Sequence, residues 1–207
     1  MLAEVGRFIL TDYIGIVIMI IIVYPILLKT LGKINPIKFY RAISPAMLVA
    51  ASTTSSAATL PVSMNVADKN IGIPANIYGF TLPLGATVNM DGMSIALGVI
   101  PVFACYLYDM PITLPFIVQF IFLGLMLSVG TAGVKGAGIV MSTILLQTLN
   151  MPLTLVPIFA AIWPIIDIGH TTTNITGDLV GTTVVASNIG AIDPQEFNNR
   201  AVEKANH

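Results

Sequence analysis

Long apolar runs dominate the chain, and polar residues interrupt them at a few places. In the first run, FILTDYIGIVIMIIIVYPILL from Phe8 to Leu28, the only charged residue is Asp12. The run is long enough to cross about 30 Å of hydrocarbon as a helix. It does not have the basic start, short apolar region and small-residue cleavage site of a signal peptide. We therefore predict a transmembrane helix over residues 8–30.

The next apolar segment is too short to cross a membrane, and it runs into a polar stretch, ASTTSSAATLP. Lys38 and Arg41 precede this unit and Lys69 follows it, so the positive-inside rule places both of its ends on one face. The pattern predicts a re-entrant hairpin over residues 40–70. Protein or a water-filled cavity must surround its non-helical tip.

Three further segments and a tail complete the pattern. We expect a helix over residues 75–106 that is broken at PLGATVNMDGM, and a second hairpin over residues 113–150 that enters from the opposite face. Residues 152–187 are expected to form a second broken helix, and the polar residues 188–207 a cytoplasmic tail. Interrupted segments at corresponding places in two inverted halves are the best sequence indication of a transporter's binding site. The predicted fold class is an all-α membrane protein built from inverted repeats of a re-entrant hairpin plus a broken helix.

The composition agrees with a membrane protein, because 56% of the residues are hydrophobic and only 9% are charged. Soluble domains carry about a quarter charged residues. The net charge of −1 and the lack of a basic run give no indication of a nucleic-acid partner, so the expected surroundings are membrane lipid. The single cysteine, Cys105, excludes an intramolecular disulfide and a cysteine-clustered metal site.

Polar residues in the last apolar segment form a regular stripe. Asp167, Thr171, Asn174 and Asp178 are spaced by four, three and four residues, and so lie on one face of a helix with His170 at its edge. A charged residue at mid-membrane costs about 2.5–3.5 kcal/mol. A polar stripe can hold helices together, but two carboxylates on one stripe favour a binding site instead.

The middle segment and the two hairpin tips carry further candidate groups. Asn89 and Asp91 break the middle helix one turn after Gly85, and oxygen ligands beside freed carbonyls suit a sodium ion. A simple kink is the structural alternative. Hydroxyls and half-helix amide groups of the first tip, residues 52–59, can bind a carboxylate. Glycines of the second tip permit close backbone approach and hinge-like opening: Gly130, Gly133, Gly136 and Gly138.

Four motifs in a fixed order identify a resemblance: TSSAATLPV, PLGATVNMDG, SVGTAGVKGAG and DIGHTTTNITGDLVGT. They resemble the glutamate-transporter, or dicarboxylate/amino acid:cation symporter, family over nearly the whole chain from residue 8 onward. The resemblance implies the core of an elevator-type secondary transporter that carries an amino acid with sodium across the cell membrane, normally as a homotrimer. Family members place scaffold helices before this region, so we expect a fragment, a truncated product or half of a split pair.

The resemblance also implies site residues by position. One sodium site would use Gly85, Asn89, Asn174 and Asp178; a second would use Asp91 with Asn89; a third would use Thr87 with the backbone of Ser128, Val129 and Thr131. Asp167 would receive the α-ammonium group of the substrate. The other substrate-binding positions would be Ser55, Ser56, Met93, Val134, Gly138, His170, Thr171 and Asn174.

Departures from the family pattern bear on the substrate. His170 replaces the arginine that grips the side-chain carboxylate of acidic substrates, Met93 replaces a threonine beside it, and a second arginine is missing at both Thr54 and Trp163. Losing a bidentate charge-assisted pair costs about 3 kcal/mol, so we predict a neutral or larger polar amino acid. A protonated His170 that holds an acidic substrate or carries a coupling proton stays open, as does a neutral histidine bonded to threonines. Lys135 replaces a tip proline, either as a snorkelling residue or as a substitute positive charge.

Other classes are weighed against a transporter. An intramembrane hydrolase needs a nucleophile, base and orienting group within hydrogen-bond reach, but His170 and Asp167 are nearly a turn apart and no serine belongs to an elbow motif. A channel would line its pore continuously with polar groups, whereas the polar residues here converge on one closed site between two gates. We therefore predict that the protein is not an enzyme, and an inactive or regulatory fragment stays open.

Overall fold

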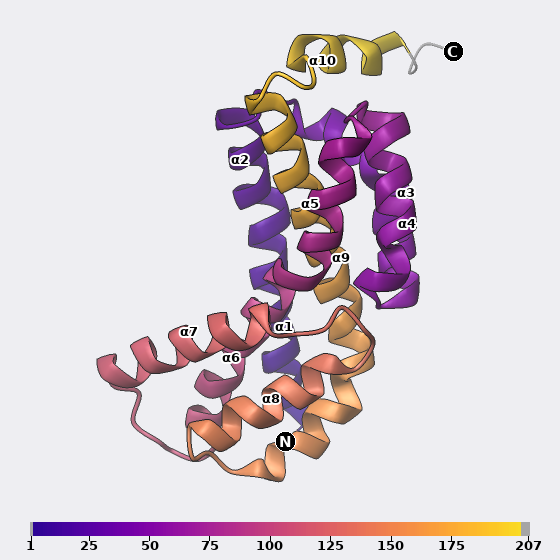
Figure 1. Ribbon diagram of the computed structural model, residues 1–207. Helices are drawn as coiled ribbons and strands as arrows, with labels where there is room; N and C mark the ends of the chain where they lie inside the picture. The colour runs from indigo at the N-terminus through magenta and orange to yellow at the C-terminus, as the bar shows by residue number, and fades with distance from the viewer. Residues whose placement is uncertain (1, 204–207) are drawn as a thin grey trace.

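The structure, a computed structural model, describes residues 2–203 (Figure 1). Within this range the chain is helical and contains no strand, which confirms the all-α class. The elements in chain order are α1 (Leu2–Ile18), η1 (Met19–Val23), α2 (Tyr24–Thr30), α3 (Pro36–Thr53), α4 (Ser56–Val66), η2 (Ala67–Ile71), α5 (Ala75–Val88), α6 (Asp91–Leu107), α7 (Leu114–Val129), α8 (Ala137–Thr148), η3 (Leu153–Leu155), α9 (Val156–Asn188) and α10 (Pro194–Glu203).

The first apolar run forms one long rod in which a π-helical turn, η1, joins α1 to α2 without a change to non-helical backbone. Residues Ala3–Thr30 are long and apolar enough to cross a membrane, as are Ala75–Leu107 and Leu153–Asn188. Large apolar side chains such as Leu10, Ile14 and Ile21 are exposed along this rod. Asp12 is fully buried, so the one carboxylate of the predicted span faces protein rather than lipid.

The first helical hairpin is made by α3 and α4. Its entry is fixed by Asn35, whose side chain accepts hydrogen bonds from the backbone N–H groups of Ile37 and Lys38 and so caps α3. At the tip, Thr54 adopts a left-handed conformation with φ of 49°, and the Ser55 hydroxyl accepts from the Ala58 N–H to cap α4. The polar residues of the tip therefore serve first to end one helix and begin the next.

The second helical hairpin is made by α7 and α8, which are joined by residues 130–136. The two hairpins approach the middle of the molecule from different ends, and their tips meet there (Figure 1). The Gly133 carbonyl accepts hydrogen bonds from the Ser55 hydroxyl at 3.1 Å and from the Ala57 N–H at 3.0 Å. The tips thus close on each other directly.

The middle segment is broken where the sequence predicts. Helix α5 ends at Val88, Asn89 and Met90 have non-helical backbone, and α6 begins at Asp91. The first N–H groups of a helix have no intrahelical acceptor. In α6 the Gly92 N–H is satisfied by the Asn174 side-chain oxygen of α9, at 2.7 Å. The break is therefore stabilised by a side chain from the polar stripe.

The expected break over residues 152–187 is wrong, because α9 is one continuous helix from Val156 to Asn188. Threonine hydroxyls along the helix donate to the carbonyls four residues earlier: Thr172 to Ile168, Thr173 to Gly169 and Thr176 to Thr172, at 2.7–2.8 Å. These local bonds satisfy the hydroxyls without opening the helix. The NITGD motif is polar but compatible with helical geometry throughout.

Buried apolar side chains form two clusters, and α9 passes through both. One cluster surrounds α2, α3 and α5 and includes Leu28, Phe39, Leu82 and Leu179. The other surrounds α1, α6 and α8 and includes Phe8, Leu97, Leu145 and Phe159. The buried polar residues of α9 lie between the two clusters, near the helix break and the hairpin tips.

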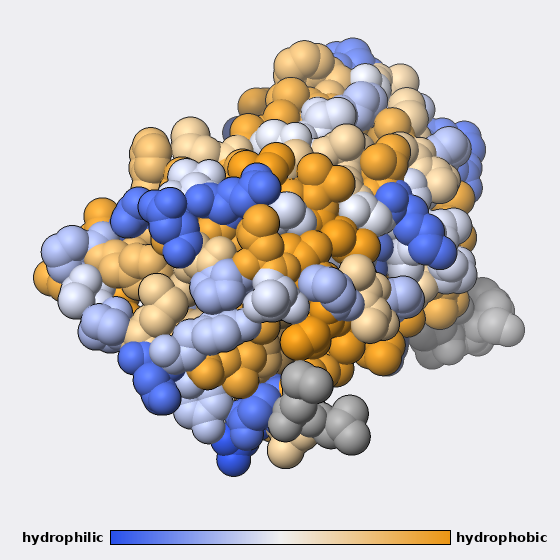
Figure 2. All heavy atoms as spheres, turned by 90° about the horizontal axis from the view of Figure 1, so that it is seen from below, coloured by the Kyte–Doolittle hydropathy of each residue, from blue (hydrophilic) through white to orange (hydrophobic). Residues whose placement is uncertain are grey.

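Exposed apolar residues cover much of the outer surface. Apolar side chains occupy large parts of the face seen from below, with hydrophilic groups scattered among them (Figure 2). Exposed apolar residues of α7 include Leu114, Val118, Ile121 and Phe122. At the opposite end, α10 lies against the loop after α2, where Asn198 accepts from the Asn35 N–H and donates to the Lys33 carbonyl.

Candidate functional site

The polar stripe of α9 faces the protein interior. Thr171, Asn174 and Asp178 are buried, with exposed fractions of 4%, 6% and 5%, and Asp167 is half-buried. His170 is also buried, at 2%. None of the five side chains is therefore in the exposed class. This is expected in a membrane protein, because a charged group in hydrocarbon is costly.

Two carboxylates meet beside the helix break. Asp178 of α9 accepts a hydrogen bond from the Asn89 side-chain amide at 3.1 Å, and Asp91 accepts one from the Tyr24 hydroxyl at 2.7 Å. The same hydroxyl lies 3.0 Å from the Thr173 carbonyl. Among the ion pairs of residues 2–203, none involves Asp91 or Asp178. Asp178 is buried and Asp91 is half-buried, and both acids thus have hydrogen bonds but no basic side chain to balance them.

Two glycines make this close approach geometrically feasible. A Cβ atom on Gly177 would lie 2.3 Å from Asp91 Oδ2, 2.7 Å from Asn89 Nδ2 and 2.8 Å from the Tyr24 hydroxyl. A Cβ on Gly85 would lie 2.5 Å from Asp178 Oδ1. No ordinary side chain tolerates such contacts. The glycines therefore let α5 and α9 bring oxygen atoms together in a small space.

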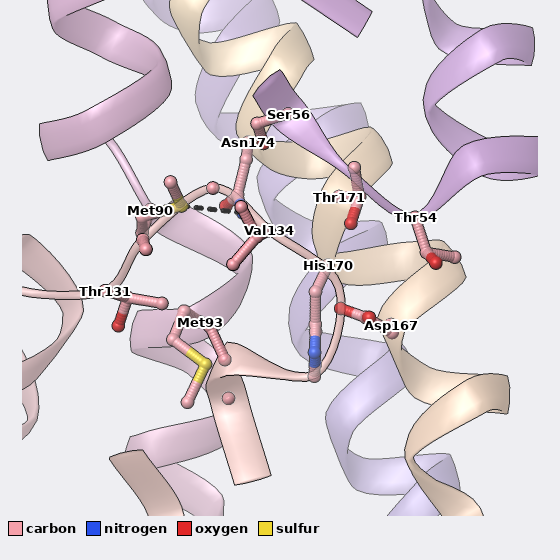
Figure 3. A pocket seen from close by; sticks show the side chains of 14 residues that line it. Thr54, Ser56, Met90, Met93, Thr131, Val134, Asp167, His170, Thr171 and Asn174 are labelled. Carbon is pink, nitrogen blue, oxygen red and sulfur yellow. Dashed lines mark hydrogen bonds between the residues drawn. The ribbon is translucent and has the colours of Figure 1, made fainter. Parts of the chain in front are cut away.

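A small cavity lies where α9, the helix break and both tips meet (Figure 3). It is lined by Thr54, Ser56, Met90, Met93, Thr131, Ala132, Gly133, Val134, Ala137, Gly138, Asp167, His170, Thr171 and Asn174. Its volume of about 30 Å³ has room for about two water molecules. Sites for small molecules typically have roughly 300–1,000 Å³, so the tips have to move apart before a larger solute fits.

The cavity brings together most of the residues expected to bind substrate: Ser56, Met93, Val134, Gly138, Asp167, His170, Thr171 and Asn174. Ser55 does not line it; its hydroxyl caps α4 and bonds to the second tip instead. Asn174 uses its side-chain oxygen on Gly92 and its amide on the Met90 sulfur, at 3.2 Å. In this arrangement its amide holds the helix break together.

The side chains of the residues expected to form a third cation site bond locally. The Thr87 side chain is exposed, and its hydroxyl donates to the Leu84 carbonyl of its own helix at 2.8 Å. The Ser128 and Thr131 side chains are buried and likewise donate to their own helix, whereas Val129 is exposed.

Two functional candidates were missed from the sequence. Asp12 of α1 lies 2.9 Å from His170 Nε2, and both side chains are buried. Tyr24 reaches Asp91 from the other half of the same rod. The signal for Asp12 was available, since a lone carboxylate within a transmembrane segment indicates a partner inside the protein. Tyr24 had no comparable signal, because a tyrosine near a helix end is common.

Comparison with known proteins connects this arrangement to a family. Residues 1–188 match the sodium:dicarboxylate symporter family. The chain belongs to this family. Its members are transporters rather than enzymes, in agreement with the prediction that the protein is not an enzyme.

Individual relatives are named as excitatory or as neutral amino acid transporters. Excitatory amino acid transporter 1 of Rattus norvegicus is 30% identical over 203 residues, which cover 98% of this chain and 37% of that protein. Excitatory amino acid transporter 3 of Homo sapiens is 32% identical, with 88% and 35% covered. Neutral amino acid transporter B(0) of Macaca fascicularis is also 32% identical, with 86% and 33% covered. The chain thus spans about a third of the length of these relatives.

Proposed function

We propose that this chain is the substrate-binding core of a symporter that couples sodium entry to the uptake of an amino acid. The observation that best supports this proposal is the cavity beside Asp167, a half-buried carboxylate with threonine and amide groups around it. An α-ammonium group would neutralise Asp167. The α-carboxylate would take hydroxyl and amide donors from Ser56, Thr171 and the hairpin tips.

The cation would bind beside the helix break. Sodium suits this position because Asp178, Asp91 and Asn89 supply oxygen atoms, and carbonyls at the end of α5 lie next to a non-helical segment. Each buried carboxylate is costly without a counter-charge. A bound monovalent cation would neutralise one carboxylate and reduce the repulsion between the two. Asn174 would join the ligands by exchanging its bond to Gly92.

The transported amino acid is neutral in this proposal. The geometry that favours it is the pairing of His170 with Asp12, at 2.9 Å, because the carboxylate cancels the charge of a protonated imidazole. No net positive charge is then left for a side-chain carboxylate. The alternative is an acidic amino acid held by protonated His170, and it would need that charge to remain uncompensated.

Alternating access would follow from movement of the tips. Both helical hairpins would be re-entrant in the membrane, and the tip around Gly133 would open the cavity by leaving Ser55 and Ala57. The three long apolar helices fit the membrane-spanning elements of such a core. With scaffold helices the assembly would be an elevator-type homotrimer whose C-terminus lies in the cytoplasm.

Equilibrium binding tests this function. The full chain in detergent is mixed with radiolabelled alanine in sodium chloride or in choline chloride, and bound label is measured. We expect binding in sodium only, competition by other neutral amino acids, and little competition by aspartate. Strong competition by aspartate alone would favour the acidic alternative, and equal binding in choline would remove sodium coupling.

A matched pair of variants locates the binding. Asp167→Asn removes the acceptor for the ammonium group and should abolish alanine binding. Asp68→Asn changes a partly exposed aspartate of η2, which pairs with Lys69 and does not line the cavity, and should leave binding unchanged. Equal behaviour of the two variants would show that Asp167 has no part in substrate binding.

A further inference from the structure

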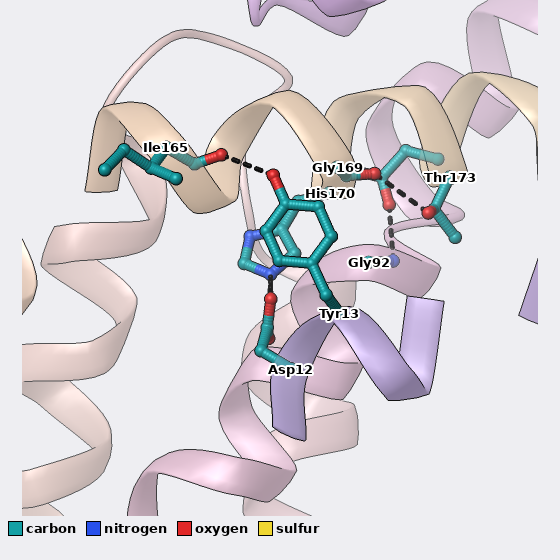
Figure 4. Close-up of polar contacts among 8 residues, drawn as sticks. Asp12, Tyr13, Gly92, Ile165, Gly169, His170 and Thr173 are labelled. Carbon is teal, nitrogen blue, oxygen red and sulfur yellow. Dashed lines mark hydrogen bonds and ion pairs between the residues drawn. The ribbon is translucent and has the colours of Figure 1, made fainter. Parts of the chain in front are cut away.

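The buried pair of His170 and Asp12 has a geometry that the proposed transport function does not by itself explain (Figure 4). His170 Nε2 lies 2.9 Å from Asp12 Oδ2 and 3.0 Å from Asp12 Oδ1. Asp12 is 0% exposed and His170 is 2% exposed. The ring is therefore held at one edge by a carboxylate from a different helix.

The other ring nitrogen has no partner. His170 Nδ1 is buried and makes no hydrogen bond among the described residues. It lies on the side of the ring away from Asp12 (Figure 4), and His170 lines the cavity while Asp12 does not. A buried polar group without a partner is costly and rare in folded proteins. One that borders a binding cavity indicates a contact completed by the ligand.

We propose that Asp12 positions His170 so that Nδ1 selects amino acids whose side chain carries a hydroxyl or carboxamide group. This inference rests on the proposed function and names the substrate class of the same site. Asp12 is a positioning residue, since it acts only through the ring. His170 contacts the side chain of the substrate.

The selection follows from hydrogen-bond chemistry in either charge state of the ring. With Nε2–H donated to Asp12, a neutral imidazole offers a lone pair at Nδ1, and an imidazolium offers an N–H there. Hydroxyl and carboxamide groups can both donate and accept, so they satisfy Nδ1 in both states. Aliphatic side chains satisfy it in neither state.

A carboxylate side chain is disfavoured for reasons of charge. It only accepts hydrogen bonds, so it repels the lone pair of a neutral ring. If the ring is an imidazolium, its positive charge is already balanced by the Asp12 carboxylate, so the substrate carboxylate gains little from it. Asp167 on the same helix interacts electrostatically with the ring and adds a second negative charge, and it interacts in turn with Lys135 of the second tip. The neighbouring α6 contributes Met93, which is apolar.

Isosteric ligands test the selection. Threonine and valine differ by a hydroxyl and a methyl group, and glutamine and glutamate differ by an amide and a carboxylate. Their dissociation constants are measured by competition against radiolabelled alanine with the full chain in sodium at one pH. We expect threonine and glutamine to bind at least tenfold more tightly than their counterparts, because a site built to hydrogen-bond rejects analogues without the group.

Variants separate positioning from folding. The double variant Asp12→Leu with His170→Phe replaces both partners by apolar groups, a change that can be nearly neutral for stability. It should bring the threonine-to-valine ratio close to one, a tenfold loss worth about 1.4 kcal/mol. Asp12→Leu alone should reduce the ratio in part. Thr11→Leu, at the exposed neighbour of Asp12, is the control and should change nothing.

The outcomes are distinguishable. An unchanged threonine-to-valine ratio in the double variant would overturn the role of the pair while leaving sodium-coupled binding intact. Tight binding of valine or glutamate by the parent would overturn the substrate class in the same way. Failure of every amino acid to bind in sodium would overturn the proposed function, and this inference with it.

Discussion

Gly177→Ala is a sharp test of how the two acids meet at the helix break. On helix propensity alone the substitution should stabilise α9 by about 1 kcal/mol. The new Cβ, however, would lie 2.3 Å from Asp91 Oδ2 and 2.7 Å from Asn89 Nδ2. Separating these groups disturbs the 2.7 Å bond from Tyr24 to Asp91, worth about 1.5–3 kcal/mol for a charged acceptor, and overpacking adds about 1–3 kcal/mol.

The losses sum to about 2.5–6 kcal/mol and exceed the gain from propensity by about 1.5–5 kcal/mol. At about 2–4 °C per kcal/mol for a chain of this size, the melting temperature should therefore fall by about 3–20 °C. The assay is thermal unfolding of the full chain in detergent over a sodium titration, in which a cation at 100 times its Kd stabilises a binding-competent protein by about 2.7 kcal/mol. Gly177→Ala should lose most of this sodium-dependent rise.

Gly181→Ala is the matched control, because it lies one turn later on the same helix and a Cβ there meets nothing within 4 Å. It should be stabilised slightly by the higher helix propensity of alanine, and its melting temperature should keep the full response to sodium. If both variants change the melting temperature and the sodium response alike, then Gly177 does not lie beneath a crowded cation site, and the reasoning is refuted.

Three other substitutions extend the test. Asp167→Asn should weaken amino acid binding more than about thirtyfold, or 2 kcal/mol, while keeping sodium-dependent stabilisation in unfolding assays; loss of both would place Asp167 at the cation instead. Asp178→Asn should remove sodium-dependent stabilisation yet leave the sodium-free melting temperature equal or higher, because one of two unbalanced buried charges is gone; a retained sodium response would argue against Asp178 as a ligand. Lys135→Gln removes a cation that interacts electrostatically with Asp167 and should tighten alanine binding by up to about fivefold, the range of an exposed pair; weaker binding would show that Lys135 contacts substrate itself.

Features that depend on local pattern were predictable from the sequence. The position of the break between Val88 and Asp91 followed from a polar motif inside an apolar segment. The spacing of Asp167, Thr171 and Asn174 fixed their common face because helical geometry repeats every 3.6 residues. The apolar arms on either side of each tip likewise predicted two hairpins.

Features that depend on how helices rotate against one another were not predictable. Asp12 meets His170 only because α1 turns that face toward α9, and a single carboxylate in a span does not name its partner. The continuity of α9 was missed because threonine-rich polar stretches can either break a helix or bond back to it. The exposed side chain of Thr87 depends on the orientation of the end of α5.

The central claim is that a monovalent cation neutralises the acids at the helix break. Anomalous diffraction from crystals of the full chain soaked in thallium(I), a heavy monovalent cation, tests it directly. We expect an anomalous peak among Asn89, Asp91 and Asp178 that disappears when excess sodium is added. A peak only elsewhere, or none at this position in crystals that bind an amino acid, would contradict the account.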